Sequence, residues 1–327
     1  MSRFLIDTDT AGDDVVSLLF GLLWPDVALE AITVCAGNVE LDLCVRNALL
    51  TVEATGRQDV PVYPGADAPL ARPLVTCHYV HGADGMGTLD PDPPRSSASD
   101  VHAVDAICEL ADRFAGDLEI IAQAPLTNIA LALRKDPDLP RKVKRLWIMG
   151  GGNNYLGNIT PAAEFNFYVD PEAAHEVLRG GFEATIVPWD VCVNDGIITR
   201  DELAPYYKLN SSLADFYFKT QAGAWGFLQS IGIDGISHPD SLMMAMAIDR
   251  SVMAESDKYF VDVEYQSDLT RGYSVMDRIG VMTHTIDDGV VVKDLMGVDD
   301  ATPNAEVVLK ADKELFKKML LQLLAAK

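Results

Sequence analysis

The sequence has little positive charge for its size. Its 327 residues include 26 lysines and arginines but 49 aspartates and glutamates, which gives a formal net charge of −23. Binding to nucleic acid through phosphate neutralisation needs clustered lysine and arginine, so this composition argues against a nucleic-acid partner. The same deficit argues against binding to an anionic membrane surface. The acidity itself favours solubility, because like charges repel one another.

Paired cysteines and long apolar runs are also missing. The longest apolar stretch, VVSLLFGLLWP, is too short to cross a bilayer, and the N-terminus lacks the long apolar region of a signal peptide. We therefore expect a soluble, cytoplasmic protein. With no C-x-x-C pair, the cysteines are typical of small apolar fillers in a reducing compartment and not of disulfides or a zinc site. They are Cys35, Cys44, Cys77, Cys108 and Cys192.

Short apolar runs alternate with amphipathic stretches along the chain. This alternation predicts an α/β fold with an open, mostly parallel (mixed) sheet, helices on both faces and a Rossmann-like arrangement, as one domain over residues 1–327. Residues 60–100 are rich in Pro, Gly and Asp and predict a long loop, whereas residues 200–240 predict helix. The predicted strands are RFLID, LEAITVC, LEIIAQ, RLWIMGGG and ATIVPWD.

Polar residues recur where the predicted strands end. Asp7 and Asp9 follow the first strand, Asn38 follows the second, Gln123 ends LEIIAQ and Asp190 ends ATIVPWD. In open parallel sheets, ligands bind at the carboxyl ends of the strands. The sequence therefore predicts a site at this edge of the sheet.

The stretch DTDTAGDD places four carboxylates within residues 7–14, namely those of Asp7, Asp9, Asp13 and Asp14. Converging carboxylates raise each other's pKa unless a cation neutralises them. Oxygen ligands and the lack of a Cys/His set favour Ca²⁺ or Mg²⁺ over zinc. Two alternatives stay open. Asp13 and Asp14 suit the first turn of a helix, and the stretch loosely fits the D-x-D-x-T/V motif of aspartyl-nucleophile phosphatases.

Taken together, the motifs resemble the inosine–uridine-preferring nucleoside hydrolase family. Its hallmark is D-x-D-x-x-x-D-D near the N-terminus. Further matches are ITVCAGN, HGADG, APLTNIALAL, HPDSLMMAMAID and TRGYS. The match is strongest in MGGGNNYLGNITPAAEFNFYVDPEAA, and the matches run in order from residue 5 to about residue 277.

The resemblance implies an enzyme that hydrolyses the N-glycosidic bond of ribonucleosides, giving ribose and a free base, with one Ca²⁺ at the floor of the site. By resemblance, the ligands of Ca²⁺ are the carboxylates of Asp9, Asp14 and Asp240 and the backbone carbonyl of Gln123. Asp9 is also the expected general base. The expected substrate-binding residues are Asp13 at the 2′-hydroxyl, Met149 under the sugar, and Asn38, Asn158, Glu164 and Asn166 at the 3′- and 5′-hydroxyls.

The EFN stretch adds an argument from spacing. Glu164 and Asn166 are two residues apart, so an extended backbone would put both side chains on one face. The sequence thus predicts that they point into the site together.

The sequence departs from the family at the residue expected to protonate the leaving base. Many members place a histidine directly before the last metal aspartate, but here Pro239 precedes Asp240 and His238 lies one position earlier. Proline restricts the residue before it. Three hypotheses follow: His238 still acts as the acid, another residue such as His81 or Tyr217 replaces it, or the base stacks on an aromatic residue such as Trp225 and takes its proton from solvent.

Other functions on the same fold are a non-catalytic or re-purposed Ca²⁺–ribose binding protein and a hydrolase of a modified ribonucleoside. A binder would need the same cation and sugar contacts, so turnover distinguishes the two classes. The resemblance also implies a role in nucleoside catabolism and purine or pyrimidine salvage, and a homodimer or homotetramer.

Overall fold

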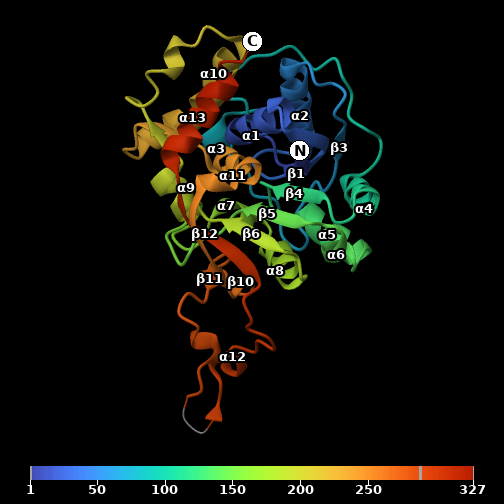
Figure 1. The fold of residues 1–327 in the computed structure, drawn as a ribbon, viewed down its shortest axis with the longest axis vertical. Coiled ribbons are helices and arrows are strands. Elements are labelled where there is room, and N and C mark those ends of the chain that lie inside the picture. Colours follow the sequence, from blue (N-terminus) through green and yellow to red (C-terminus); the bar gives the residue numbers. More distant parts are fainter. Residues whose placement is uncertain (1, 287–288, 327) are drawn as a thin grey trace.

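The computed structural model describes residues 2–286 and 289–326. Within these residues the chain forms an eight-stranded sheet in which only β12 and β9 pair antiparallel (Figure 1). This mixed, mostly parallel sheet confirms the predicted fold class. In sheet order the strands are β3 (Val62–Pro64), β2 (Val27–Val34), β1 (Ser2–Thr8), β4 (Leu118–Ala122), β5 (Arg145–Met149), β6 (Ala184–Val187), β12 (Ala305–Ala311) and β9 (Met253–Tyr259).

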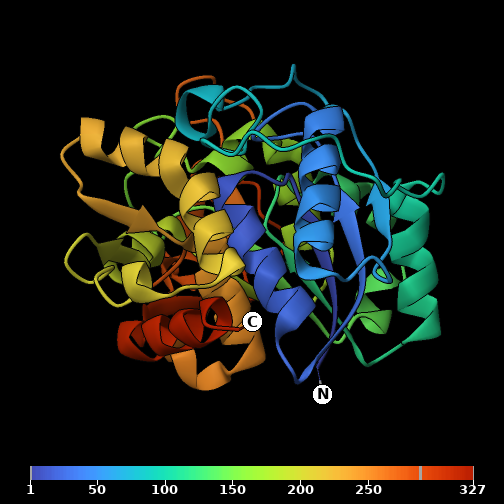
Figure 2. The same cartoon turned by 90° about the horizontal axis from the view of Figure 1, so that it is seen from above.

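Helices cover both faces of the sheet (Figures 1 and 2). Side chains alternate across a strand, so Phe4 and Ile6 of β1 enter one core while Leu5 enters the other. The first core packs against α1 (Gly12–Leu23), α2 (Leu41–Thr55), α9 (Trp189–Asp195), α10 (Ser212–Ser230), α11 (Pro239–Ile248) and α13 (Lys313–Leu324). The second packs against α4 (Ala103–Arg113), α5 (Thr127–Lys135), α6 (Leu139–Lys142) and α8 (Pro171–Arg179).

Two regions without a strong strand pattern frame the carboxyl edge of the sheet. Residues 60–100 are mostly loop, as predicted, apart from β3 and the short α3 (His78–His81). The predicted helical region contains α10, after which β8 (Gly235–Ser237) pairs antiparallel with β7 (Ile197–Thr199). A further short helix, α7 (Phe165–Val169), follows the glycine-rich stretch after β5.

Residues 277–286 and 289–304, between β11 (Ser274–Met276) and β12, extend away from the body at the lower end of Figure 1 and include α12 (Val292–Leu295). The base of this extension is the antiparallel pair of β10 (Val261–Val263) and β11. In the part of the chain that the structure describes, we find no helix that is both long and apolar enough to cross a membrane.

The position of α1 depends on close packing at Gly21. A Cβ atom at this position would lie 2.7 Å from Cδ1 of Ile6 in β1 and 3.3 Å from Cδ2 of Leu29 in β2. Glycine therefore lets the helix approach the sheet closely, and this approach sets where the first turn of α1 meets the carboxyl end of β1.

We predict that Gly21→Leu destabilises the protein by about 1–3 kcal/mol, because the added side chain overpacks this contact. Gly226→Leu is the matched control, since Gly226 is exposed on α10 and a Cβ atom there meets nothing within 4 Å. The control should keep or raise the melting temperature, because leucine favours helix over glycine. Equal melting temperatures for the two variants in thermal unfolding would contradict the packing argument.

Candidate active site

A cavity of about 460 Å³ opens at the carboxyl edge of the sheet. Its polar side is formed by residues that follow β1, β2, β4 and β5 and by the starts of α7 and α11. Nine of the residues predicted from the sequence line it: Asp13, Asn38, His81, Gln123, Met149, Asn158, Glu164, Asn166 and Asp240. The predicted edge of the sheet therefore brings these residues together around one space.

A group of three carboxylates lies at this cavity. Asp13, Asp14 and Asp240 each offer an oxygen, and these oxygens lie within 4.8 Å of one another. The first turn of α1 supplies Asp13 and Asp14, and the first turn of α11 supplies Asp240. Helix N-termini carry partial positive charge, which partly compensates for acidic side chains placed there.

Burial makes this group electrostatically costly. It raises the pKa of Asp14 to about 6, and the charge of Asp13 adds to the effect. Burial, and then the charge of Asp13, holds the pKa of Asp240 well above its usual range. The pKa of Asp9 is likewise raised by burial and by Asp14. Each of these carboxylates would ionise more readily beside a cation.

The residues present fit a hard divalent cation. The donors are all oxygens, and in residues 2–286 and 289–326 the buried Oδ1 atoms of Asp9 and Asp13 accept no hydrogen bond from the protein. Buried acceptors without a donor are rare, and a cation satisfies them. The cluster can therefore bind a metal ion.

Neighbouring side chains fix the orientation of Asp14. Thr8 Oγ1 donates to Asp14 Oδ1 over 2.6 Å, and Gln123 Nε2 donates to the same oxygen over 3.0 Å. Asn38 Nδ2 donates to Asp14 Oδ2 over 3.0 Å. These donors leave the carboxylate little rotational freedom. Thr8 was not among the residues predicted from the sequence, although it alternates with the aspartates in DTDT.

Asp9 is fully buried and does not itself line the cavity, but it contacts Asn38, which does. Its Oδ2 accepts the backbone N–H of Asn38 over 2.7 Å. A Cβ atom at Gly37 would lie 2.1 Å from that Oδ2, so the loop after β2 needs glycine where it passes the carboxylate. This contact leaves Oδ1 as the oxygen available to a ligand.

The predicted ligand set overlaps only in part with the three-carboxylate group. Asp14 and Asp240 belong to both, whereas Asp13 takes the place expected for Asp9 within the group. The carbonyl oxygen of Gln123 accepts a hydrogen bond from Asn166 Nδ2 over 3.4 Å, while its side-chain amide supports Asp14.

Asp7, the first aspartate of the motif, does not join the group. Its Oδ1 accepts hydrogen bonds from Thr33 Oγ1 over 2.6 Å and from Asn128 Nδ2 over 2.8 Å. Two of the motif's four carboxylates, those of Asp13 and Asp14, therefore belong to the group, whereas Asp7 connects β1 to β2 and α5.

The EFN stretch reaches the cavity by a different backbone than predicted. Glu164 is extended and is the N-cap of α7, but Asn166 lies inside that helix, so the expectation of an extended EFN backbone is wrong. The Glu164 carboxylate accepts the backbone N–H groups of Asn166, Phe167 and Gly151 over 2.8, 3.2 and 2.8 Å. Burial raises its pKa to about 7, although these three donors oppose the shift.

Asn166 and Asn158, which were also predicted to contact the sugar, lie in α7 and in the loop before it. Asn166 Nδ2 donates to the carbonyl oxygen of Met149 over 3.1 Å, which ties α7 to the end of β5. Asn158 lies in the loop before α7, where its backbone N–H donates to the carbonyl oxygen of Ala163 over 3.0 Å. Asn158 and Met149 both line the cavity.

The opposite side of the cavity is apolar and was missed by the sequence analysis. Tyr79 of α3 meets Phe227 of α10 edge to face, with ring centroids 5.6 Å apart. Trp189, Leu228 and Ile231 extend the same wall. These residues come from separate segments of the chain and share no motif. Their spacing in the sequence therefore does not predict that they form one apolar wall.

The two histidines have different positions. His81 lines the cavity, with Nδ1 4.0 Å from Asp13 Oδ1, and burial lowers its pKa to about 4. His238 is fully buried outside the cavity. Its Nε2 is 2.8 Å from the hydroxyl oxygen of Tyr217 and its Nδ1 is 3.1 Å from the carbonyl oxygen of Gly196. This geometry gives no support to a catalytic role for His238 or Tyr217.

Trp225 also lies outside the cavity. Its indole N–H donates to Asp234 Oδ1 over 3.2 Å, and the Arg200 guanidinium lies over the ring, 5.0 Å from its centroid. The predicted stacking of a base on Trp225 therefore has no support. Phe227, two residues along the same helix, faces the cavity instead.

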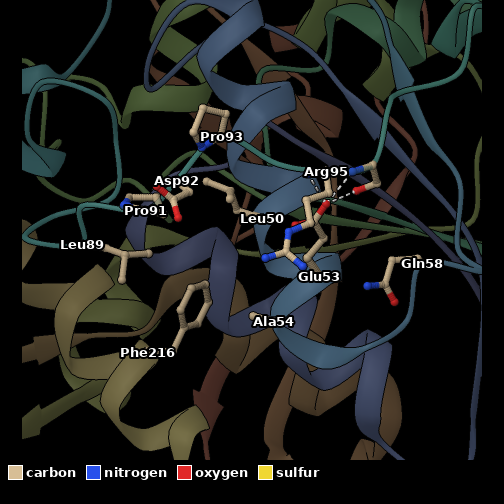
Figure 3. A pocket seen from close by; sticks show the side chains of 11 residues that line it. Leu50, Glu53, Ala54, Gln58, Leu89, Pro91, Asp92, Pro93, Arg95 and Phe216 are labelled. Carbon is tan, nitrogen blue, oxygen red and sulfur yellow. Dashed lines mark hydrogen bonds between the residues drawn. The ribbon is translucent and has the colours of Figure 1, made fainter.

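A second, larger cavity lies away from these residues (Figure 3). It measures about 670 Å³ and runs between α2 and the proline-rich loop that contains Pro91 and Pro93, with Phe216 of α10 at one side. The Glu53 carboxylate, which lines this cavity, accepts hydrogen bonds from the backbone N–H groups of Arg95 and Ser96. None of the residues predicted for the site line this cavity.

Comparison with known proteins agrees with the motifs. An uncharacterized protein of Schizosaccharomyces pombe is 36% identical over 282 residues, covering 84% of this chain and 89% of the relative. Uridine nucleosidase 1 of Arabidopsis thaliana is 33% identical over 283 residues, covering 84% and 82%. The alignment covers most of the length of both relatives.

The fold comparison gives the same result. The solved structure of a plant nucleoside hydrolase superimposes with a TM-score of 0.90 at 28% identity, covering 100% of this chain and 99% of that one. A statistical model of the family described as inosine-uridine preferring nucleoside hydrolase matches residues 4–318. The predicted family and enzyme class are confirmed, and the chain belongs to the inosine-uridine preferring nucleoside hydrolase family.

Proposed function

We propose that this protein hydrolyses the N-glycosidic bond of ribonucleosides in a Ca²⁺-dependent reaction that releases ribose and a free base. The observation that carries the proposal is the group of half-buried Asp13 and buried Asp14 and Asp240 at a cavity whose walls carry further polar side chains. An all-oxygen donor set of this kind suits Ca²⁺, which takes several oxygen ligands at once. The family match supports the same reaction.

The residues that would hold the cation are Asp9, Asp13, Asp14 and Asp240, with the carbonyl of Gln123 as a further oxygen. A bound divalent cation supplies positive charge that offsets the carboxylates and polarises the oxygens it contacts. Thr8, Gln123 and Asn38 keep Asp14 in a fixed orientation. The site is thus organised before a substrate arrives.

Asp9 is the proposed general base. Its Oδ2 is held by the backbone N–H of Asn38, so Oδ1 is free to accept the proton of the attacking water. A base must lie within hydrogen-bond reach of that proton, and Asp9 lies close enough to Asp14 and Asp13 for their charges to act on it. Water then adds to C1′ as the bond to the base breaks.

The remaining polar residues are proposed to bind ribose. Asp13 and Asn38 come from the start of α1 and the loop after β2, and Glu164, Asn166 and Asn158 come from the start of α7 and the loop before it. Positive charge develops on the sugar ring as the glycosidic bond breaks. The carboxylates of Asp13, Glu164 and Asp240, which line the cavity, would stabilise that charge, while hydrogen bonds to the hydroxyls would orient C1′ toward the water.

The leaving base is proposed to occupy the apolar side, between Tyr79, Phe227 and Trp189. His81 is the imidazole that lines the cavity within the described residues. Its low pKa makes it neutral at pH 7, so it would donate a hydrogen bond from a neutral ring and not act as an imidazolium acid. Activation of the leaving group is assigned to His81 together with solvent.

The relatives indicate which substrates to try first. The family description names inosine and uridine, and the Arabidopsis relative is a uridine nucleosidase. Both nucleosides are therefore the first candidates, and nucleoside catabolism and salvage is the corresponding role. Self-association as a homodimer or homotetramer stays a prediction that the family resemblance supports.

We predict that the purified protein releases ribose from inosine, uridine or both, and that chelation abolishes the release. Removing the cation leaves mutually repelling carboxylates, which take up protons and can no longer hold the sugar or serve as a base. Ca²⁺ added back should restore the rate. Reducing-sugar assays of inosine, adenosine, guanosine, uridine and cytidine provide the measurement. Protein that binds Ca²⁺ and retains ribosides without releasing a base would indicate the non-catalytic alternative, unless a modified ribonucleoside is turned over.

We predict that Asp9→Asn lowers kcat by at least about 10²-fold, because the amide cannot accept the proton of the attacking water. The amide keeps the size of the carboxylate, so the melting temperature should stay close to that of the wild type. Asp100→Asn, at an exposed position remote from the cavity, is the matched control and should keep full activity. Undiminished turnover by Asp9→Asn would remove the assigned role of Asp9.

We predict that Tyr217→Phe lowers stability without lowering catalysis. The change removes the hydroxyl that contacts Nε2 of His238 and leaves that buried nitrogen unpaired, at a cost of about 1–3 kcal/mol. Turnover measured well below the melting temperature should stay within about threefold of the wild type. His81→Ala should show the reverse pattern, a loss of more than tenfold in kcat/KM with a small change in melting temperature. A large loss of kcat in Tyr217→Phe would instead place the Tyr217–His238 pair in the chemistry.

A further inference from the structure

Cys77 contacts Asn38 at two points in the wall of the cavity. The backbone N–H of Cys77 donates to the carbonyl oxygen of Asn38 over 2.9 Å. Its thiol Sγ donates to Asn38 Oδ1 over 2.9 Å. The cysteine lies directly before α3, whereas Asn38 lies in the loop after β2. A side chain that the sequence indicated only as a small apolar filler thus makes a directed polar contact at the site.

The orientation of the Asn38 amide matters because its nitrogen faces carboxylates. Nδ2 donates to Asp14 Oδ2 over 3.0 Å and to the carbonyl oxygen of Asp9 over 3.5 Å. If the amide turned over, Oδ1 would face the Asp14 carboxylate and the two acceptors would repel each other. A donor on the far side of the amide selects the orientation observed, and the Cys77 thiol is that donor.

We propose that Cys77 is a positioning residue whose thiol fixes the Asn38 amide and, through it, the Asp14 carboxylate that holds the cation. The inference rests on the proposed Ca²⁺-dependent function and extends it to a residue outside the predicted set. Cys77 would raise the affinity for Ca²⁺ without touching the cation or the reacting atoms.

The surroundings of Cys77 suit this role. The side chain is buried and packs with Phe165 and Val169 of α7. Burial raises the pKa of the thiol, so it stays protonated and remains a donor. The backbone carbonyl oxygen of Cys77 accepts hydrogen bonds from the backbone N–H groups of Val80 and His81. Cys77 therefore connects Asn38 to the helix that carries His81.

The test measures Ca²⁺ binding to chelator-treated, full-length protein by calorimetry. Cys77→Val keeps the approximate size and removes the donor, whereas Cys77→Ser keeps a donor. We expect Cys77→Val to weaken Ca²⁺ binding about five- to tenfold, in line with the loss of one hydrogen bond. Cys77→Ser should stay within about twofold of the wild type. The half-saturating Ca²⁺ concentration for ribose release should shift in parallel, while kcat at saturating Ca²⁺ should be kept.

Two controls separate positioning from packing. Cys108→Val, at a half-buried cysteine on α4 remote from the cavity, should leave Ca²⁺ affinity unchanged. In an Asn38→Ala background, Cys77→Val should cause no further loss, because the two residues act in series. The metal-free melting temperature of Cys77→Ser should match that of the wild type, and that of Cys77→Val should fall by no more than the loss of one hydrogen bond allows.

The outcomes are distinct. Normal Ca²⁺ affinity in Cys77→Val, or an equal loss in the Asn38→Ala background, would overturn the inference. Wild-type protein that binds Ca²⁺ but turns over no nucleoside would remove the proposed function, and the calorimetric comparison would still decide the role of Cys77.

Discussion

The site depends on carboxylates that are buried together at the carboxyl edge of the sheet. Burial alone raises the pKa values of Asp9, Asp14 and Asp240, and their proximity raises them further. The protein compensates in part with helix N-termini and with amide and hydroxyl donors aimed at Asp14. This partial compensation leaves the group rich in negatively charged oxygens, and these oxygens can bind a divalent cation. The fold supplies the geometry, because parallel strands end at the same edge and bring residues from distant parts of the chain together.

Much of this arrangement follows from local sequence patterns. The alternation of apolar runs with amphipathic stretches predicts the sheet, and a polar residue after a buried strand predicts the edge at which ligands bind. What the patterns do not contain is the direction of a side chain in irregular backbone. Pro239 begins α11 and leaves His238 as its N-cap, and there the ring turns into the core toward Tyr217. Spacing likewise places Glu164 near Asn166, but the start of α7 replaces the extended backbone that the spacing suggests.

The two sides of the cavity differ in how far sequence can predict them. The polar side is built from strand ends and helix starts, where few residue types satisfy the geometry. The apolar side is assembled from α3, α9 and α10, whose residues contact one another only in the folded chain. Tyr79 and Phe227 are 148 positions apart in the sequence yet meet edge to face. Motifs therefore identify the proposed sugar and cation contacts, whereas the wall proposed to contact the base is assembled only by the fold.

The displacement of His238 from the cavity changes how the leaving base has to be handled. A neutral imidazole at His81 and an apolar wall offer a hydrogen bond and desolvation, but no strong acid. In the proposed reaction, catalysis would therefore depend more on stabilising the positive charge of the sugar by carboxylates than on protonating the base. The rate of the proposed reaction would then depend on how precisely those carboxylates are oriented. Thr8, Gly37 and Cys77 would therefore matter to the proposed chemistry through the side chains beside them: Thr8 donates to Asp14, Gly37 leaves room for Asp9, and Cys77 donates to Asn38.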